Sequence, residues 1–154
     1  AAIWKWCPGE RMKQSDVKYF PIYRYADVLL LRAEALNQLN DYKGAIDVLN
    51  QIRKRAGIVE KEMSEFDVAV DKKTAIEDAI LQERQLELLG EGKRWFDLIR
   101  TGRAMTVMND FFENYIKQYS NFNCQTFTEE WQLYWPVYHN NLMENENLTQ
   151  FGKY

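Results

Sequence analysis

Charged residues stand at positions of this chain where an α-helix should present apolar side chains to a core. Glu83 and Glu87 lie one helical turn apart. They share their stripe with three apolar residues, Ile76, Ala79 and Ile80. A carboxylate on a core-facing stripe is costly unless a cation and hydrogen bonds meet it. The chain therefore holds either a buried network of ion pairs or an acid–base catalytic site.

A pair of carboxylates could serve a glycosidase, in which two acids flank the sugar bond and one of them has a raised pKa. Here both acids lie on one helical stripe, and the same charged stretch supplies Arg24, Arg84 and Arg94. Bidentate pairing with arginine would keep both carboxylates ionised. This favours a structural role over proton transfer, and we assign no catalytic residue.

Composition excludes several function classes. The net charge of −3 argues against nucleic-acid binding, and no apolar run approaches the about 20 residues that span a bilayer. With one histidine, His139, and two distant thiols, Cys7 and Cys124, the chain lacks the ligands of a zinc site, and it suggests no metal or cofactor. The N-terminus shows neither a signal peptide nor an initiator Met, so we expect a processed, truncated or fragmentary chain.

Apolar periodicity predicts an all-α fold. The expected helices cover Tyr23–Leu39, Tyr42–Arg55, Thr74–Leu89, Lys93–Arg100 and Thr106–Tyr119. Asp41 should cap the second helix, Gly57 should end it, and Thr74 with Glu77 should form a capping box for the third. The first two helices resemble one tetratricopeptide hairpin, which must stack on neighbouring helices to bury its apolar face.

Two segments are expected to be irregular. The first, 60–73, should be a solvated loop with Phe66, Val68 and Val70 as possible anchors. The second follows Ser120 and is rich in Asn and aromatic residues. Aromatic rings offer a large contact area to sugars or peptides, but they also anchor loops to a core. The candidate ligand-binding residues are Trp4, Trp6, Trp131 and Trp135.

Several motifs resemble the SusD/RagB family. The first is Phe20-Pro21-Ile22-Tyr23-Arg24-Tyr25-Ala26-Asp27-Val28-Leu29-Leu30, followed by Ala33-Glu34-Ala35. The most specific is Ile80, Glu83-Arg84, Glu87-Leu88 and the run Glu91-Gly92-Lys93-Arg94-Trp95-Phe96-Asp97-Leu98-Ile99-Arg100-Thr101-Gly102. In the tail, Pro136-Val137, Asn145, Leu148, Gln150 and Tyr154 match, whereas Tyr138, Glu146, Phe151, Gly152 and Lys153 depart from the family pattern.

The resemblance implies a fold and an organisation. It implies that residues 1–154 are the C-terminal part of such a protein, with tetratricopeptide-like helical hairpins and long irregular C-terminal loops. We expect a helical core over about 20–119 and an irregular tail over about 120–154. The charged residues of the family motifs should lock the first, third and fourth helices together as a structural ion network: Arg24, Asp27, Glu34, Glu83, Arg84, Glu87, Glu91, Arg94 and Asp97.

The resemblance also implies a function. SusD-like proteins are non-catalytic and lie on the outer face of the bacterial outer membrane. They are held there by a lipid anchor, which would belong to an N-terminal part absent from this sequence. They bind glycans or other nutrient oligomers for a TonB-dependent SusC-like transporter. The alternative is a tetratricopeptide-type interaction module that binds a peptide segment.

Overall fold

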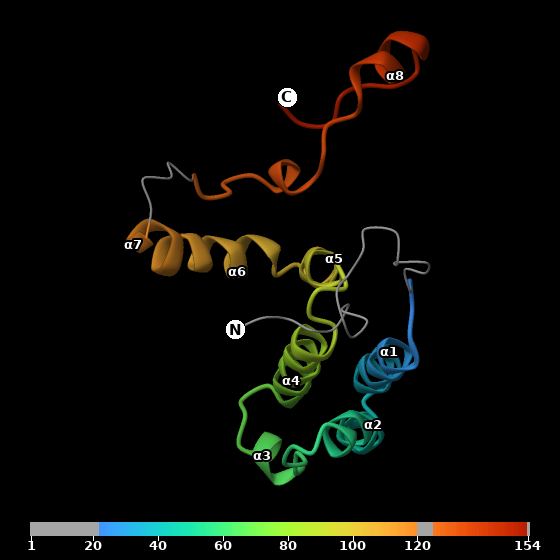
Figure 1. The fold of residues 1–154 in the computed structure, drawn as a ribbon, viewed down its shortest axis with the longest axis vertical. Coiled ribbons are helices and arrows are strands. Elements are labelled where there is room, and N and C mark those ends of the chain that lie inside the picture. The colour runs from blue at the N-terminus through green and yellow to red at the C-terminus, as the bar shows by residue number, and fades with distance from the viewer. Residues whose placement is uncertain (1–21, 120–124, 154) are drawn as a thin grey trace, which may run out of the picture. The chain divides into compact units, whose positions relative to one another are not determined.

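Helices connected by turns and irregular segments make up the residues that the computed structural model describes, 22–119 and 125–153 (Figure 1). Trp4, Trp6, Cys7 and Cys124 lie outside these ranges. The elements are α1 (Tyr25–Gln38), α2 (Tyr42–Arg55), α3 (Ser64–Asp67), α4 (Lys72–Glu87), α5 (Arg94–Arg100), α6 (Ala104–Phe111), the π-helix η1 (Phe112–Ile116), α7 (Lys117–Tyr119), the 3₁₀-helix η2 (Glu130–Leu133) and α8 (His139–Glu144). No strand occurs in these ranges, which confirms the predicted all-α fold.

The chain divides into two compact units between Arg94 and Trp95. Each unit has a buried apolar cluster of its own. None of the described helices has the length and apolar character needed to cross a bilayer.

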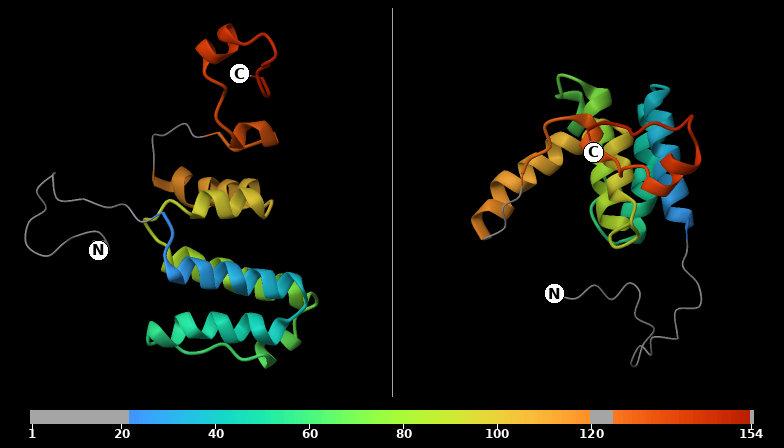
Figure 2. Two further views of the ribbon diagram at one scale, coloured as in Figure 1. Left: turned by 90° about the vertical axis from the view of Figure 1, so that its right-hand side faces the viewer. Right: turned by 90° about the horizontal axis from the view of Figure 1, so that it is seen from above.

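The first unit is a helical hairpin with a third helix packed on it. Helices α1 and α2 lie side by side and run in opposite directions, and α4 packs against both (Figure 2). Leu30, Leu49, Ile76 and Ile80 are fully or almost fully buried where the three helices meet. The tetratricopeptide-like hairpin thus buries its apolar face against α4, as the periodicity predicted.

The ends of α2 follow the sequence prediction, whereas the start of α4 does not. Asp41 caps α2 by accepting a hydrogen bond from the Gly44 amide, and Gly57 takes a φ of +71° just after the helix ends. The proposed capping box of Thr74 and Glu77 is wrong. The cap of α4 is Asp71, whose carboxylate accepts from both the amide and the hydroxyl of Thr74, so the helix begins two residues earlier than expected.

The segment 60–73 is not a continuous loop. It contains the short helix α3, which places Phe66 in the apolar cluster of the first unit. Val68 is largely and Val70 fully solvent-exposed, so their prediction as anchors is wrong. The buried Phe66 ring and the partly buried Met63 pack this short segment against the apolar cluster, and α3 contacts α4.

The second unit is built around α5, α6 and η2. Leu98, Ala104 and Leu133 form its buried cluster. Phe127 contacts the rings of both Trp95 and Phe112, with centroids 6.3 and 5.9 Å away. The Asn109 side chain holds both backbone groups of Phe127, donating to its carbonyl and accepting from its amide, each at 2.8 Å. These contacts fix the segment after residue 124 to α6.

The helix predicted over Thr106–Tyr119 begins earlier, at Ala104, and passes through the π-helical turn η1. Tyr115 is exposed and stacks on Phe111, with 5.5 Å between the ring centroids. A π-helix places more residues in each turn than an α-helix does, which shifts the side chains that follow it away from a simple helical stripe.

The aromatic tail is more ordered than predicted, since it contains η2 and α8 in place of loop alone. Its two limbs are joined by a series of side-chain contacts that we call the tail ladder. The pairs are Glu129–Lys153, Trp131–Gly152, Tyr134–Phe151 and Val137–Gln150. Gln150 closes the ladder by accepting from the Val137 amide at 2.9 Å and donating to its carbonyl at 3.3 Å. Helix α8 lies in the segment that connects the limbs.

Gly152 is a rung of the tail ladder where a larger residue would force the Trp131 side chain or the backbone to shift. Its φ is +76°, and a Cβ atom there would lie 2.6 Å from the Trp131 ring. We expect Gly152→Ala to destabilise the full-length protein more than Gly102→Ala, and to increase hydrogen exchange in the tail ladder. Gly102 is a matched control because its φ is +68° with open space around it, so alanine there adds only the left-handed backbone cost of about 1–2 kcal/mol.

The free energy of unfolding in urea and amide exchange over residues 129–137 measure the two effects. Equal unfolding free energies for the two variants, with tail exchange unchanged, would show that the Trp131 ring is not packed on Gly152.

Candidate functional site

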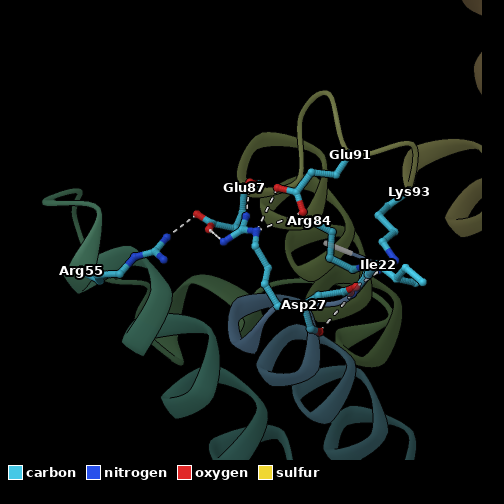
Figure 3. A network of polar contacts seen from close by, with 8 residues as sticks. Ile22, Asp27, Arg55, Arg84, Glu87, Glu91 and Lys93 are labelled. Carbon is cyan, nitrogen blue, oxygen red and sulfur yellow. Dashed lines mark hydrogen bonds and ion pairs between the residues drawn. The ribbon is translucent and has the colours of Figure 1, made fainter. Parts of the chain in front are cut away.

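The most buried charges of the first unit belong to Asp27 on α1 and Arg84 on α4. Their side chains are only 1% and 3% exposed. Arg84 Nη1 lies 2.9 Å from Asp27 Oδ1, and Lys93 Nζ lies 3.3 Å from Asp27 Oδ2. Figure 3 shows Asp27 between Arg84 and Lys93. Each carboxylate oxygen thus faces a cation, although neither accepts a well-aligned hydrogen bond within the described part of the chain.

Arg24, just before α1, joins two further carboxylates. Its Nε donates to both oxygens of Glu91, at 2.9 and 3.0 Å. Its Nη1 donates to the Glu87 carboxylate at 2.6 Å, and its Nη2 to the Glu87 carbonyl. Burial alone would lower the pKa of the Arg24 guanidinium, but the hydrogen bonds that it donates to Glu87 and Glu91, together with their negative charges, raise the pKa above its ordinary value.

Two arginines in the last turn of α2 complete the network. Arg53 Nη1 lies 2.6 Å from Glu83 Oε2, and Arg53 Nε donates to the Val59 carbonyl at 2.8 Å. Arg55 pairs with the second oxygen of Glu87 (Figure 3). Neither arginine was predicted as a network member. The available signal was the basic last turn of α2, which directly follows the buried Ile52.

Lys93 was also missed as a network member, although it belongs to the motif that carries the resemblance. Besides facing Asp27, its Nζ donates to the Ile22 carbonyl at 2.6 Å and lies 4.0 Å from the centre of the Tyr23 ring. Lys93 therefore fixes the segment that leads into α1 against the turn that follows α4.

The nine predicted network residues do not all pair with one another in the structure. It brings Arg24 together with Glu87 and Glu91, and Asp27 together with Arg84, whereas Glu83 pairs with the unpredicted Arg53. Glu34 lies half-buried on α1. Arg94 Nη1 donates to the Leu81 carbonyl at 3.3 Å, and Asp97, in the second unit, pairs with Arg100 of its own helix at 2.8 Å.

The electrostatics of this network suit a lock between helices better than proton transfer. Burial tends to raise the pKa of Glu87, but hydrogen bonds from Arg55 and Arg24, together with their charges, hold it below its ordinary value. A general acid at neutral pH needs the opposite shift. Among the described residues, no group of three His, Cys, Asp or Glu side chains is placed to hold a metal ion.

The predicted aromatic residues of the tail differ in exposure. Trp131 is half-buried, with its ring against Gly152 and its indole N–H donating to Glu129 at 2.8 Å. Trp135 is 90% exposed. It borders an open pocket of about 500 Å³ that is also lined by Trp95, Gln132, Leu133, Tyr134 and Pro136. Of the four candidate ligand-binding residues, Trp135 is therefore the one that the structure leaves accessible beside a cavity, and Trp4 and Trp6 lie outside the described ranges.

Removing the charge of Asp27 should strongly destabilise the protein, because Arg84 would remain buried and charged opposite a neutral amide. For Asp27→Asn we expect the free energy of unfolding to fall by about 3–5 kcal/mol. Urea denaturation of the full-length protein measures it. Asp47→Asn is the control, since it removes the same charge from a solvent-exposed pair with Lys43 and should leave the midpoint nearly unchanged. Equal midpoints for the two variants would contradict a structural role for the buried pair.

Because the pKa of Glu87 is lowered in the folded state, part of the free energy of unfolding depends on pH in the acidic range. Its carboxyl binds a proton less readily in the folded state than in the unfolded chain. Its contribution is therefore complete above the ordinary value of about 4.5 and is lost as the pH falls through the lower folded pKa. We expect Glu87→Gln to flatten the decline in unfolding free energy below about pH 4.5. Above about pH 6 the carboxyl is ionised in both states, so the slopes of variant and wild type should coincide there. An unchanged slope in acid would contradict the pairing.

Comparison with known proteins identifies the family. The model of the SusD family matches residues 7–154. The SusD-like protein P38 of Formosa agariphila is 39% identical over 131 residues, which is 84% of this chain and 23% of that protein. Two further proteins of this organism, SusD-like protein P25 and SusD-like protein P2, are 36% and 34% identical over 65% and 60% of this chain, and 18% of each.

The chain thus spans about a fifth of the length of the curated relatives it matches. No solved structure matches it significantly. The family match extends over almost the whole sequence and agrees with the all-α fold. The chain belongs to the SusD family.

Proposed function

We propose that this chain is part of a non-catalytic protein that binds glycans, or other nutrient oligomers, at the cell surface. Membership of the SusD family supports this role in general. The partner that this proposal includes is a SusC-like TonB-dependent transporter in the outer membrane, to which the bound oligomer is delivered. Attachment to the membrane would be through a lipid anchor outside this sequence.

The observation that carries the proposal is the exposed Trp135 beside the aromatic pocket of the second unit. The flat face of an indole ring stacks on the C–H face of a sugar, and a largely exposed ring can do so without unpacking a core. The pocket volume of about 500 Å³ lies in the range of small-molecule sites. The buried acids of the network in the first unit support the same conclusion, because Asp27, Glu83, Glu87 and Glu91 are paired with cations and therefore poorly suited to catalysis.

Isothermal titration of the full-length protein with oligosaccharides and with peptides tests this proposal. We expect an oligosaccharide to bind with a measurable heat and to remain uncleaved. In Trp135→Ala the affinity should fall at least tenfold. The scale is taken from nucleobases, whose stacking on an aromatic side chain contributes about 1–3 kcal/mol. Tyr25→Ala is the control, because Tyr25 is also an exposed aromatic residue but lies on α1, in the first unit.

Three outcomes would overturn the proposal. Heat from peptides but from no oligosaccharide would favour the tetratricopeptide-type interaction module. Cleavage of the bound glycan would establish an enzyme. If neither oligosaccharides nor peptides bind, the protein lacks the binding activity that we propose, although it belongs to the family.

A further inference from the structure

We propose that the second unit holds a subsite for a neutral oligosaccharide, formed by two adjoining pockets that share Gln132. This inference rests on the proposed function and locates it. The first pocket is the aromatic one that Trp135 borders. The second, of about 360 Å³, is lined by Glu113, Lys117, Gln125, Thr126, Thr128 and Gln132. Both are lined only by residues of the second unit.

The two pockets offer different chemistry to a ligand. The aromatic pocket presents the rings of Trp95, Tyr134 and Trp135. The second pocket presents amide and hydroxyl groups, and no hydrogen bond within the described residues uses the side chains of Gln125 or Thr126. A sugar needs both kinds of surface, because its ring has apolar C–H faces and a rim of hydroxyl groups. An oligomer of two or more sugars could stack one unit in the first pocket and hydrogen-bond the next in the second.

Gln132 is held rigidly between the pockets. Its side-chain oxygen accepts hydrogen bonds from the amides of Thr128 and Glu129, at 2.8 and 3.0 Å. Its amide nitrogen donates to no partner among the described residues, so the N–H groups remain available to a ligand. The neighbouring Phe127 is fixed to α6 by Asn109. A group positioned in advance binds with a smaller loss of conformational entropy.

The charge of this surface selects a neutral ligand. Residues 95–154 carry 4 basic and 7 acidic side chains, a net charge of −3. Among the described residues, Lys117 is the only cation that lines either pocket, and it is paired with Glu113. Glu129, beside Gln132, pairs with Lys153. Carboxylated or sulfated sugars would be repelled by the net negative charge of this surface, because its lysines are already paired with carboxylates. Uncharged sugars would experience no such repulsion.

The test uses the full-length protein and two sets of probes of equal length. Glucan, mannan and xylan hexasaccharides are the neutral set, and oligogalacturonate hexasaccharide is the acidic probe. We expect at least one neutral probe to bind at least tenfold more tightly than the acidic one. Binding of that neutral probe should weaken at least tenfold in Trp135→Ala and about threefold in Gln125→Ala. The monosaccharide of the same sugar should bind far more weakly than the hexasaccharide.

Gln118→Ala is the matched control for Gln125→Ala, because Gln118 is an exposed glutamine on α7 that lines neither pocket. Trp135 and Gln125 are both exposed, so their replacement should leave the unfolding midpoint unchanged. If a glycan binds with wild-type affinity to both variants, this subsite is wrong while the proposed function stands. Tighter binding of the acidic probe overturns the neutral selectivity. If no probe binds, the subsite fails, and if no other oligosaccharide binds either, the proposed function fails with it.

Discussion

The buried pair of Asp27 and Arg84 is the interaction on which the first unit most depends. It joins α1 to α4 where both helices are otherwise covered by aliphatic side chains, so neither partner could be left alone without a large desolvation cost. The pairs made by Arg53, Arg24 and Arg55 are progressively more exposed, with arginine side chains 18%, 26% and 55% exposed. The arrangement selects one register of three helices, because sliding any of them by a turn would separate buried charges from their partners. Aliphatic contacts alone tolerate such a shift more readily.

Much of the first unit was predictable because its signals are local. The helical spacing of apolar residues, with Asp41 as cap and Gly57 as stop, predicted the bounds of α2. The same spacing identified the stripe of α4 that carries Glu83 and Glu87. The partners of those acids were harder to predict. Arg53 and Arg55 lie 30 and 32 residues away from the acids they pair with, and their approach depends on how α2 packs against α4. The start of α4 was missed because Asp71 and Thr74 are both good caps, and only the backbone geometry chooses between them.

The second unit was less predictable, for a physical reason. Its tail is held by contacts that follow neither a helical nor a strand period: an indole ring over a glycine, an edge-to-face pair of rings, and a glutamine that holds a backbone amide and carbonyl. The abundance of aromatic residues indicated that this tail has a role. It did not distinguish Trp131, which serves the packing, from Trp135, which faces the solvent. A residue that remains exposed although burying it would be favourable is a reasonable place to look for binding.

The tail ladder has a consequence for how this part of the molecule can vary. Its rungs join Glu129, Trp131, Tyr134 and Val137 to partners that follow in reverse order, and α8 occupies the apex. Since the limbs are closed below the apex, residues inserted after α8, between Asn145 and Asn147, would extend an already closed turn at a small additional entropic cost. Relatives could therefore lengthen or replace this tip without disturbing the pockets at its base. An engineered epitope or fluorophore could be placed there for the same reason.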